Sequence, residues 1–317
     1  MTGFYLGTGQ ECCYDENGEV ETCAGSGQDA EFGTGLQPPE PRFLVENEIV
    51  LDRLTGLSWT HDANLAEFPL TWKEALNYIR ELNRTRRLGY DDWRLPNRRE
   101  LRSLISYQTR KPALPAGHPF ENVFLGWYWS STTSAVNKDY AWYVHLEGGR
   151  MFYGNKRQTY LVWPARGPGY PVLPQTVRGG EFGLGVARPL PRFNILGETV
   201  RDEPTGLIWT RDAGLGGRLM DWMSALNFIR NLNAAGFEGR RTWRLPTINE
   251  LESLVDVRRH HPALPTNHPF RNVLTTYASS TSSGFEPDWC MALHMDKGAV
   301  GVGFKKSAGF GVWAASS

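Results

Sequence analysis

The chain carries one sequence pattern twice, and this repeat limits what it can fold into. Trp93-Arg94-Leu95-Pro96 recurs as Trp243-Arg244-Leu245-Pro246, and the other matched segments keep the same displacement of 150 positions (243 − 93) over about the first 90 residues of each copy. Stacked repeats have much shorter periods, roughly 20 to 50 residues. A period of 150 within 317 residues therefore predicts two copies of one domain.

The repeat also gives the expected domain boundaries. Residues 1–40 are polar and glycine-rich and end in a proline-rich stretch, which predicts an N-terminal arm rather than a domain. Residues 41–167 are expected to form the first domain, residues 168–190 a linker, and residues 191–317 the second domain. These two domains are called the first copy and the second copy below.

Each copy is expected to hold two short helices. Thr71 with Glu74, and Asn97 with Glu100, have the spacing of capping boxes, and Asp221 and Thr247 take the N-cap positions in the second copy. The apolar positions expected on the buried faces are Trp72, Ala75, Leu76, Ile79 and Leu82 for the first helix and Leu101, Leu104 and Ile105 for the second. A proline-rich segment follows, which predicts an ordered loop.

The repeated tryptophans are expected to build the two cores. They are Trp59, Trp72 and Trp93 in the first copy and Trp209, Trp222 and Trp243 in the second. Arg94 and Arg244 are expected to pair with a carboxylate or with backbone carbonyls, because Arg is rarely buried without a partner. The last third of each copy has the alternation of antiparallel strands, and the copies diverge there, which favours that region for contacts with partners.

The charge balance gives no electrostatic case for a nucleic-acid or membrane partner. The 34 basic and 34 acidic residues cancel, and the isoelectric point lies near 7.1. No run of about 18 apolar residues occurs, so no segment is expected to span a bilayer. The 12 Trp, 34 Gly and 20 Pro instead predict short strands, many turns and bulky aromatic anchors.

Three of the four cysteines cluster near the start of the chain. An Asn17-Gly18 turn signal lies midway between Cys13 and Cys23, as in a hairpin closed by a disulfide, and Cys23 is expected to pair with Cys12 or Cys13. The cluster predicts an exported protein, although the first residues have no charged and apolar regions of a signal peptide. A reduced cytosolic cluster stays open as the alternative.

The motifs resemble a known bacterial family. The quoted residues are Thr55-Gly56-Leu57 with Trp59, Gly89-Tyr90-Asp91-Asp92-Trp93-Arg94-Leu95-Pro96 with Glu100-Leu101, Tyr128-Trp129-Ser130-Ser131-Thr132-Thr133 and Val162-Trp163-Pro164 with Arg166-Gly167. Together they resemble the domain at the C-terminus of Legionella collagen-like adhesin, over about residues 41–167 and 191–317. The second copy departs from the pattern at its end, where Tyr277-Ala278-Ser279-Ser280 and Val312-Trp313-Ala314-Ala315 stand and the closing Arg is lacking.

This resemblance implies an α+β, C-type-lectin-like fold with two short helices packed on small antiparallel sheets in each copy. It also implies an extracellular or cell-surface location and a binding or adhesion role. No catalytic residues follow from it. The preferred hypothesis is therefore a non-catalytic module that recognises a glycan, an anionic polymer or a protein surface.

The candidate ligand-binding residues lie on the C-terminal strands and loops. Aromatic faces suit sugar rings, and Arg or Lys suits sulfate or carboxylate. The predicted residues are Arg150, Lys156, Arg157, Tyr153, Asp139, Tyr140, Lys297, Lys305, Lys306, Glu286, Asp288 and Trp289. The alternative, ordinary strand-edge charges that discourage sheet pairing, stays open.

Metal and catalytic readings are weaker. Glu286-Pro287-Asp288 before Trp289 partly matches a calcium-dependent sugar site, but calcium prefers six to eight oxygen ligands and this loop offers two carboxylates, so no metal or cofactor is predicted. His118 and His268, each followed by Pro in a loop, are expected to be structural, and no nucleophile and base can be paired from spacing.

A second functional class is a structural subunit of a surface assembly. The N-terminal arm is unrepeated before Glu31, so it is expected to be able to join a neighbouring subunit of the same kind by adding a strand.

Overall fold

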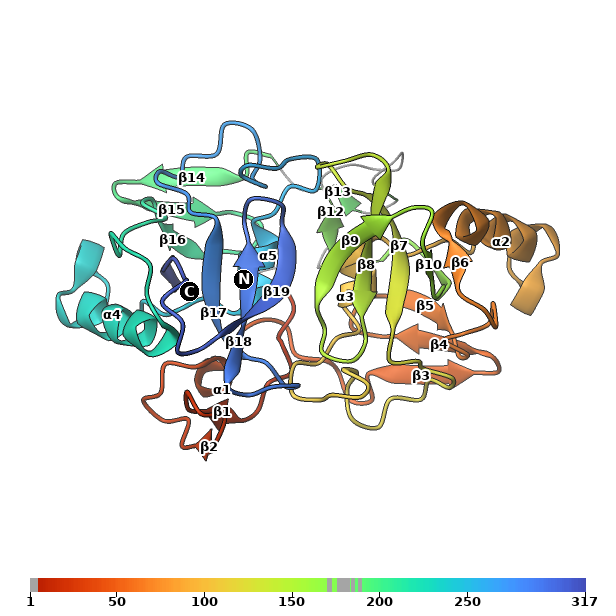
Figure 1. The fold of residues 1–317 in the computed structure, drawn as a ribbon, viewed down its shortest axis with the longest axis horizontal. Coiled ribbons are helices and arrows are strands. Elements are labelled where there is room, and N and C mark those ends of the chain that lie inside the picture. The colour runs from red at the N-terminus through yellow and green to blue at the C-terminus, as the bar shows by residue number, and fades with distance from the viewer. Residues whose placement is uncertain (1–4, 170–172, 176–182, 184–185, 188–189) are drawn as a thin grey trace. The chain divides into compact units, whose positions relative to one another are not determined.

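A computed structural model of the chain describes residues 5–169, 173–175, 183, 186–187 and 190–317 (Figure 1). The chain forms two compact units. Residues Gln37–Ala187 form the first-copy unit, and Met1–Leu36 together with Arg188–Ser317 form the second-copy unit. The arm that begins the chain therefore belongs with the second copy, although the first copy follows it in sequence.

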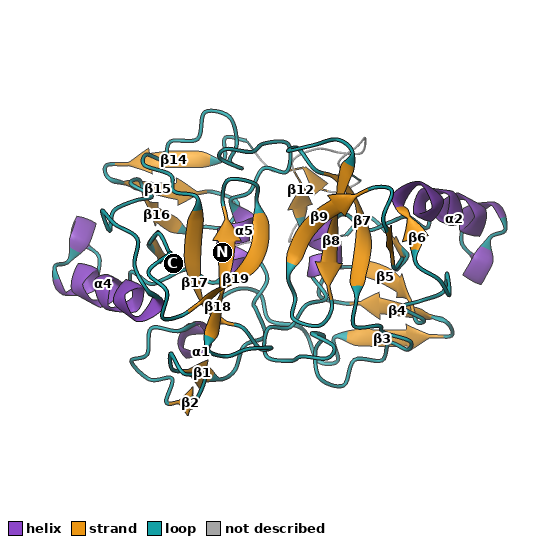
Figure 2. Ribbon diagram, in the orientation of Figure 1, coloured by secondary structure: helices purple, strands orange, loops and turns teal. Residues whose placement is uncertain are grey.

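The first-copy unit holds a four-stranded antiparallel sheet and a second group of antiparallel strands (Figure 2). The four-stranded sheet has the order β11 (Ala165–Arg166), β5 (Leu57–Thr60), β4 (Ile49–Asp52) and β3 (Phe43–Glu46). β7 (Trp127–Thr133) pairs with β8 (Tyr140–His145), which pairs with β9 (Met151–Asn155). The smaller elements are β6 (Leu70–Thr71), β10 (Thr159–Tyr160), β12 (Pro174–Gln175), β13 (Val186–Ala187), α2 (Trp72–Arg84), η1 (Arg87–Gly89) and α3 (Arg98–Arg102).

The second copy repeats this arrangement. Its four-stranded sheet has the order β14 (Phe193–Leu196), β15 (Thr199–Asp202), β16 (Ile208–Thr210) and β20 (Ala315–Ser316), and β17 (Thr276–Ser282), β18 (Trp289–His294) and β19 (Ala299–Phe304) pair in sequence. Its helices are α4 (Trp222–Ala234), η3 (Phe237–Gly239) and α5 (Ile248–Ser253). The arm adds β1 (Cys13–Tyr14), β2 (Val20–Glu21) and α1 (Asp29–Phe32) to this unit.

The helices begin where their sequence signals predict. Thr71 and Asn97 accept hydrogen bonds from the N3 backbone amides in complete capping boxes, and Asp221 caps α4 through the amide of Ser224. The predicted stripe of α3 was wrong at its end, because the helix stops at Arg102. Leu104 and Ile105 lie beyond it and are nevertheless buried.

The tryptophan cores are confirmed, with one difference between the copies. Trp59, Trp93, Trp209 and Trp243 are at most 2% exposed. Trp222 is fully buried, whereas its counterpart Trp72 is only half-buried.

The predicted arginine pairs are also confirmed. Arg94 binds Glu100 through two hydrogen bonds of 2.5 and 2.8 Å, and Arg244 binds Glu250 through two of 2.5 and 2.6 Å. Each Glu also completes the capping box of its helix, so the motif joins its Arg to the start of the helix that follows. A buried ion pair with all partners satisfied favours one local arrangement.

Candidate binding surfaces

In both copies a lysine lies against the tryptophan that starts the long helix. The Lys156 ammonium lies 4.2 Å from the centroid of the Trp72 ring, and the Lys305 ammonium lies 4.1 Å from that of Trp222. Backbone hydrogen bonds fix the arrangement, because the amide of each Trp donates to the carbonyl of its Lys at 3.1 and 2.9 Å respectively. A cation over an indole face is attracted by the ring quadrupole.

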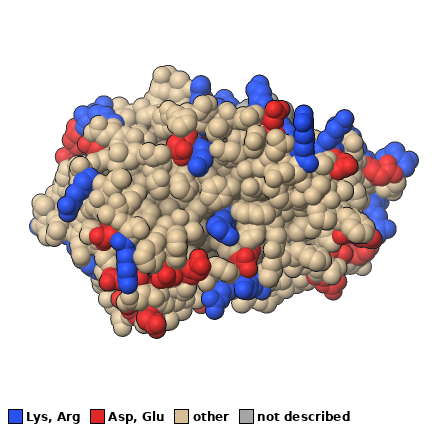
Figure 3. All heavy atoms as spheres, in the orientation of Figure 1, with Lys and Arg blue, Asp and Glu red and all other residues tan. Residues whose placement is uncertain are grey.

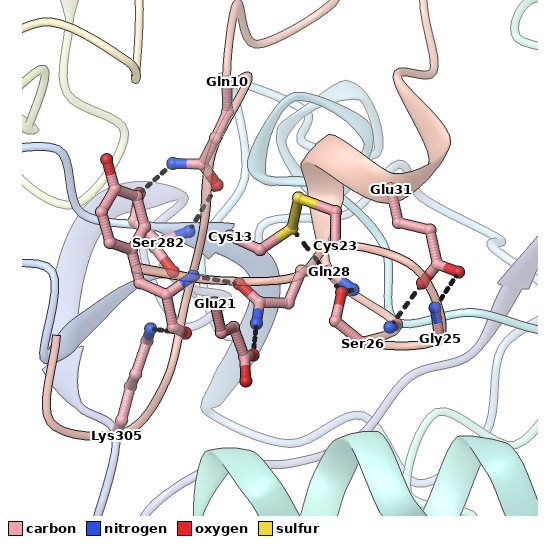
Figure 4. The surroundings of a disulfide bond; sticks show 12 residues. Gln10, Cys13, Glu21, Cys23, Gly25, Ser26, Gln28, Glu31, Ser282 and Lys305 are labelled. Atoms are coloured by element: carbon pink, nitrogen blue, oxygen red, sulfur yellow. Dashed lines mark hydrogen bonds between the residues drawn. A yellow bond between two sulfur atoms is a disulfide. The ribbon is translucent and has the colours of Figure 1, made fainter. Parts of the chain in front are cut away.

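The N-terminal hairpin, defined here as residues 10–28, covers this place in the second copy (Figure 4). The Lys305 ammonium donates to the carbonyl oxygens of Tyr14 at 2.8 Å and Asp15 at 3.0 Å. Lys306 donates to the side-chain oxygen of Asn17 at 2.6 Å. Burial lowers the pKa of Lys305 to about 8.

The sequence prediction of Lys305 as a surface contact for an external ligand needs correction. Its side chain is fully buried, and its donors are used by the arm of the same chain. The hairpin itself is closed by a disulfide between Cys13 and Cys23, while Cys12 is a free thiol. This resolves the pairing that the sequence left open.

The hairpin turn lies against the Glu286-Pro287-Asp288 loop, which partly matches a calcium-dependent sugar site in sequence. Gly18 has a φ of +84°, and a Cβ added there would lie 2.8 Å from the amide nitrogen of Asp288. Glycine is therefore required for both the turn and the close approach. The Pro287-Asp288 segment contacts the chain's own arm.

Further anchors hold the rest of the arm on the second copy. Arg230 donates to the carbonyls of Gly25 at 3.0 Å and Ser26 at 2.9 Å. The Gln10 side chain exchanges two hydrogen bonds of 2.9 Å with the backbone of Ser282. Asn249 donates to the carbonyls of Leu6 and Gly7 at 3.0 Å each.

A buried acid of the arm lies beside the Arg244–Glu250 pair. Asp29 is 1% exposed and accepts a hydrogen bond from the Thr281 hydroxyl. The pKa of the Asp29 carboxyl is raised from 3.8 to about 6, chiefly by burial and also by the nearby Glu250 carboxylate, while the hydroxyls of Thr281 and Thr8 and the charge of Arg244 oppose the rise. The docked arm therefore holds a carboxyl that favours its neutral form more than a free Asp does.

In the first copy, five predicted residues gather at one end of the β8–β9 pair. The amide of Lys156 donates to the carbonyl of Asp139 at 2.8 Å, and the Tyr140 and Tyr153 rings meet edge to face at 6.0 Å between centroids. Arg157 follows Lys156 and is exposed. Arg150 is not part of this group, because it lies at the turn between β8 and β9.

The second copy shows the same division. The amide of Lys305 donates to the carbonyl of Asp288 at 3.1 Å, and the amide of Trp289 donates to that of Glu286 at 2.9 Å. These residues and Lys306 thus adjoin one another, whereas Lys297 lies at the β18–β19 turn with its ammonium 3.9 Å from Asp296. Figure 3 shows charges of both signs over the visible face of the protein.

A groove of about 600 Å³ in the first copy was missed by the sequence analysis. It lies along β3, β4 and η1 and is lined by Leu44, Glu46, Glu48, Leu51, Tyr90 and Arg166, among others. The Arg166 guanidinium lies 3.6 Å from the centroid of the Tyr90 ring and donates to Asp92 at 2.7 Å. Tyr90 is 37% exposed, so part of its side chain is accessible to a ligand.

The second copy has different residues at the key groove positions. Arg240 stands where the first copy has Tyr90, Ser316 where it has Arg166, and Asn194 where it has Leu44. The differences at Tyr90 and Leu44 fall in the part of the repeat that the copies otherwise share, whereas the one at Arg166 falls in the last third, where they diverge. Comparing the two copies position by position reveals these differences in the sequence. The sequence does not show, however, that the differing residues face one groove.

His118, His268 and Ser130, a serine of the motif at residues 128–133, all have structural contacts. His118 and His268 stack on Phe120 and Phe270 at 6.0 Å between ring centroids, and burial lowers the pKa of both imidazoles. The Ser130 hydroxyl is buried and donates to the carbonyl of Trp142 at 2.8 Å. Within the described parts of the chain, no three His, Cys, Asp or Glu side chains are grouped to hold a metal ion.

None of the described helices is both long and apolar enough to cross a membrane. No curated protein matches the chain. The family model of the Lcl C-terminal domain matches residues 48–166 and 198–315, which together make up more than half of the 317 residues. The two matched ranges coincide with the two copies described above, each with its four-stranded sheet and capped helices. The chain therefore belongs to the Lcl C-terminal domain family and carries two tandem copies of that domain.

Proposed function

We propose that this protein is a non-catalytic adhesion module, exported to the cell surface or beyond, that binds a glycan in the groove of the first copy. The observation that carries the proposal is the groove lined by Tyr90, Arg166 and the aliphatic and acidic residues of β3 and β4. The family match and the Cys13–Cys23 disulfide support an exported, adhesin-like role. The fold proposed for each copy is C-type-lectin-like.

The groove offers what a sugar ring requires. Leu44 and Leu51 are 40% and 37% exposed and can meet the C–H faces of a sugar, while the Glu46 and Glu48 carboxylates can accept hydrogen bonds from its hydroxyls. Binding sites for small ligands combine an apolar lining with a few polar groups that fix orientation. A few such hydroxyl contacts would give the site its selectivity.

The charges of the groove narrow the ligand class. Glu46 and Glu48 are acidic, and the one cation named in the lining, Arg166, is already bonded to Asp92. A sulfated or uronic-acid polymer would bring further negative charge to these carboxylates. We therefore propose a neutral or amino sugar as the groove ligand, and assign the Lys156 region to a different partner below.

A glycan array probed with the purified full chain, with and without a chelator, tests this proposal. Binding to neutral or amino sugars that survives the chelator is expected. Tyr90→Ala should weaken that binding about tenfold or more, because a hot-spot aromatic contributes on the order of 2 kcal/mol. Arg240→Ala, at the equivalent position of the second copy, is the matched control and should leave binding unchanged. Equal glycan binding by the wild type, Tyr90→Ala and Arg240→Ala would show that the ligand binds outside the groove.

Two other functional classes remain as alternatives. A structural subunit joined to its neighbours through the arm is less favoured, because the arm packs in one compact unit with the second copy of its own chain and accepts a hydrogen bond from its Lys305. An enzyme is less favoured because the serine and histidine candidates are used in backbone hydrogen bonds and aromatic stacking. Measuring the mass in solution after deletion of residues 1–36 distinguishes the structural subunit from the adhesion module.

A further inference from the structure

The N-terminal hairpin is an acidic peptide that docks on cations. Residues 10–28 contain no Lys or Arg and five acidic residues, Glu11, Asp15, Glu16, Glu19 and Glu21. On the second copy its backbone and side-chain oxygens accept hydrogen bonds from Arg230, Lys305 and Lys306. The Asp15 and Glu21 carboxylates also interact favourably with the charge of Lys305, and charge complementarity favours encounter and fixes orientation.

The first copy has the same cations at the same places. Arg80 corresponds to Arg230 on the long helix, and Lys156 and Arg157 correspond to Lys305 and Lys306 after the last long strand. Arg80 also repeats the local geometry, because it donates to Asn77 at 2.6 Å as Arg230 donates to Asn227 at 2.5 Å. Arg80 and Arg157 are exposed.

The second-copy residues that line a pocket next to the arm are identical in the first copy. In the second copy a pocket of about 170 Å³ lies between the arm and the residues Leu226, Ile229, Arg230, Asn233, Trp243 and Arg244. The first copy has Leu76, Ile79, Arg80, Asn83, Trp93 and Arg94 at these positions, identical in all six cases. Leu76 and Trp72 are half-buried, whereas Leu226 and Trp222 are at most 2% exposed.

The chain supplies the hairpin only once. In the arm, Leu6 and Leu36 form a parallel bridge, and the first-copy unit has a matching parallel pair between Pro174 and Val186. The first pair is separated by 30 positions (36 − 6) and the second by 12 (186 − 174), and residues 173–187 contain no cysteine. Because residues 173–187 contain no cysteine, this part of the chain cannot supply a second disulfide-closed hairpin.

We propose that the surface formed by Trp72, Leu76, Arg80, Lys156 and Arg157, called here the first-copy docking surface, binds an acidic peptide hairpin supplied by another polypeptide. The second copy shows the mode of binding. The long-helix Arg and the two lysines after the strand donate hydrogen bonds to oxygens of the hairpin, and Gly27 of the hairpin lies against Leu226. This site is separate from the groove beside Tyr90 and does not depend on the glycan proposal.

The test uses the full chain, with its own arm in place, and a fluorescent synthetic peptide of residues 10–28 oxidised between Cys13 and Cys23, with Cys12→Ser. Fluorescence anisotropy measures binding at about 50 mM and about 300 mM salt, since screening between exposed charges grows over this range. The probe has the chemistry that the second copy is seen to bind. A control peptide carries Gln or Asn in place of the five acidic residues.

Arg80→Glu is the decisive variant, because Arg80 is exposed and its replacement leaves the core unchanged. We expect saturable binding of one peptide per chain, weakened at least tenfold by Arg80→Glu, by the higher salt and in the neutral control peptide. Arg230→Glu is the matched control in the second copy and should not weaken binding of the added peptide. Circular dichroism melting checks that each variant is folded.

The outcomes separate the proposal from its competitors. Absence of binding up to millimolar peptide, or equal binding by the Arg80→Glu variant, would overturn it. Loss of binding with Arg230→Glu alone would show exchange with the chain's own arm instead, and would also overturn it. If the full chain self-associates, and both Arg80→Glu and deletion of residues 1–36 abolish this, the proposal is supported with a second copy as the source of the hairpin.

Discussion

The Lys305 ammonium lies 4.1 Å from the Trp222 ring centroid and is fully buried, with its hydrogen bonds directed to the carbonyls of Tyr14 and Asp15. The equivalent Lys156 lies 4.2 Å from Trp72 and donates to the Thr133 hydroxyl of its own copy at 2.9 Å. The same pair of residues thus supports a docked arm in one copy and a half-exposed surface in the other. This contrast leads to the predictions that follow.

Replacing Lys305 by Met is expected to loosen the arm. The variant keeps the apolar stem but leaves two arm carbonyls without their donor, which costs about 1–3 kcal/mol. Amides of residues 13–28 should then exchange with solvent roughly tenfold faster or more, as measured by hydrogen-exchange mass spectrometry. The matched variant Lys156→Met should leave exchange in the arm unchanged. Equal exchange in all three proteins would show that Lys305 does not hold the arm.

Docking of the arm is expected to weaken as the pH rises from about 4 to about 6. The pKa of Asp29 is raised from 3.8 to about 6 when the arm is docked, so the docked state binds more protons than the free arm within this window. Above about pH 6 Asp29 is largely ionised, and docking weakens no further from this cause. Asp29→Asn removes the charge and should make exchange in the arm slower than in the wild type at pH 7, with the difference vanishing at pH 4. A variant that loosens the arm at pH 7 would contradict this account.

Trp93 is expected to contribute more to stability than Trp72. Trp93 is 2% exposed and its indole donates to the carbonyl of Arg87 at 3.1 Å, whereas Trp72 is half-buried. Trp93→Ala should lower the free energy of unfolding of the first-copy unit by about 3–5 kcal/mol. Urea denaturation measures both variants. A smaller loss for Trp93→Ala than for Trp72→Ala would show that the core is wrongly assigned.

Deleting residues 1–36 tests how the arm acts in solution. Because the arm lies against Leu226, Arg230 and Lys305 of its own chain, its removal is expected to expose apolar surface and lower the melting temperature of the second-copy unit. Light scattering should show no fall in the number of chains per particle. A fall from an oligomer to a monomer that Arg80→Glu does not reproduce would instead favour the alternative in which the arm joins subunits through another surface.

The sequence alone determined the local structure of this protein. Capping boxes at Thr71, Asn97 and Thr247 placed the helix starts, because a side chain that accepts from the N3 amide can act only at the first turn. The cysteine spacing and the Asn17-Gly18 signal placed a disulfide hairpin, and the displacement of 150 positions gave the two copies. Each of these depends on residues that are close in sequence or repeated in register.

The tertiary structure decided which copy the arm covers and which residues face a common surface. Contacts such as Lys305 to Tyr14, or Arg230 to Gly25, join residues more than 200 positions apart, and no local pattern links them. The groove likewise joins Leu44, Tyr90 and Arg166 from three separate segments. Identical residues in the two copies therefore came to have different surroundings, because burial depends on what packs against a residue from elsewhere in the chain.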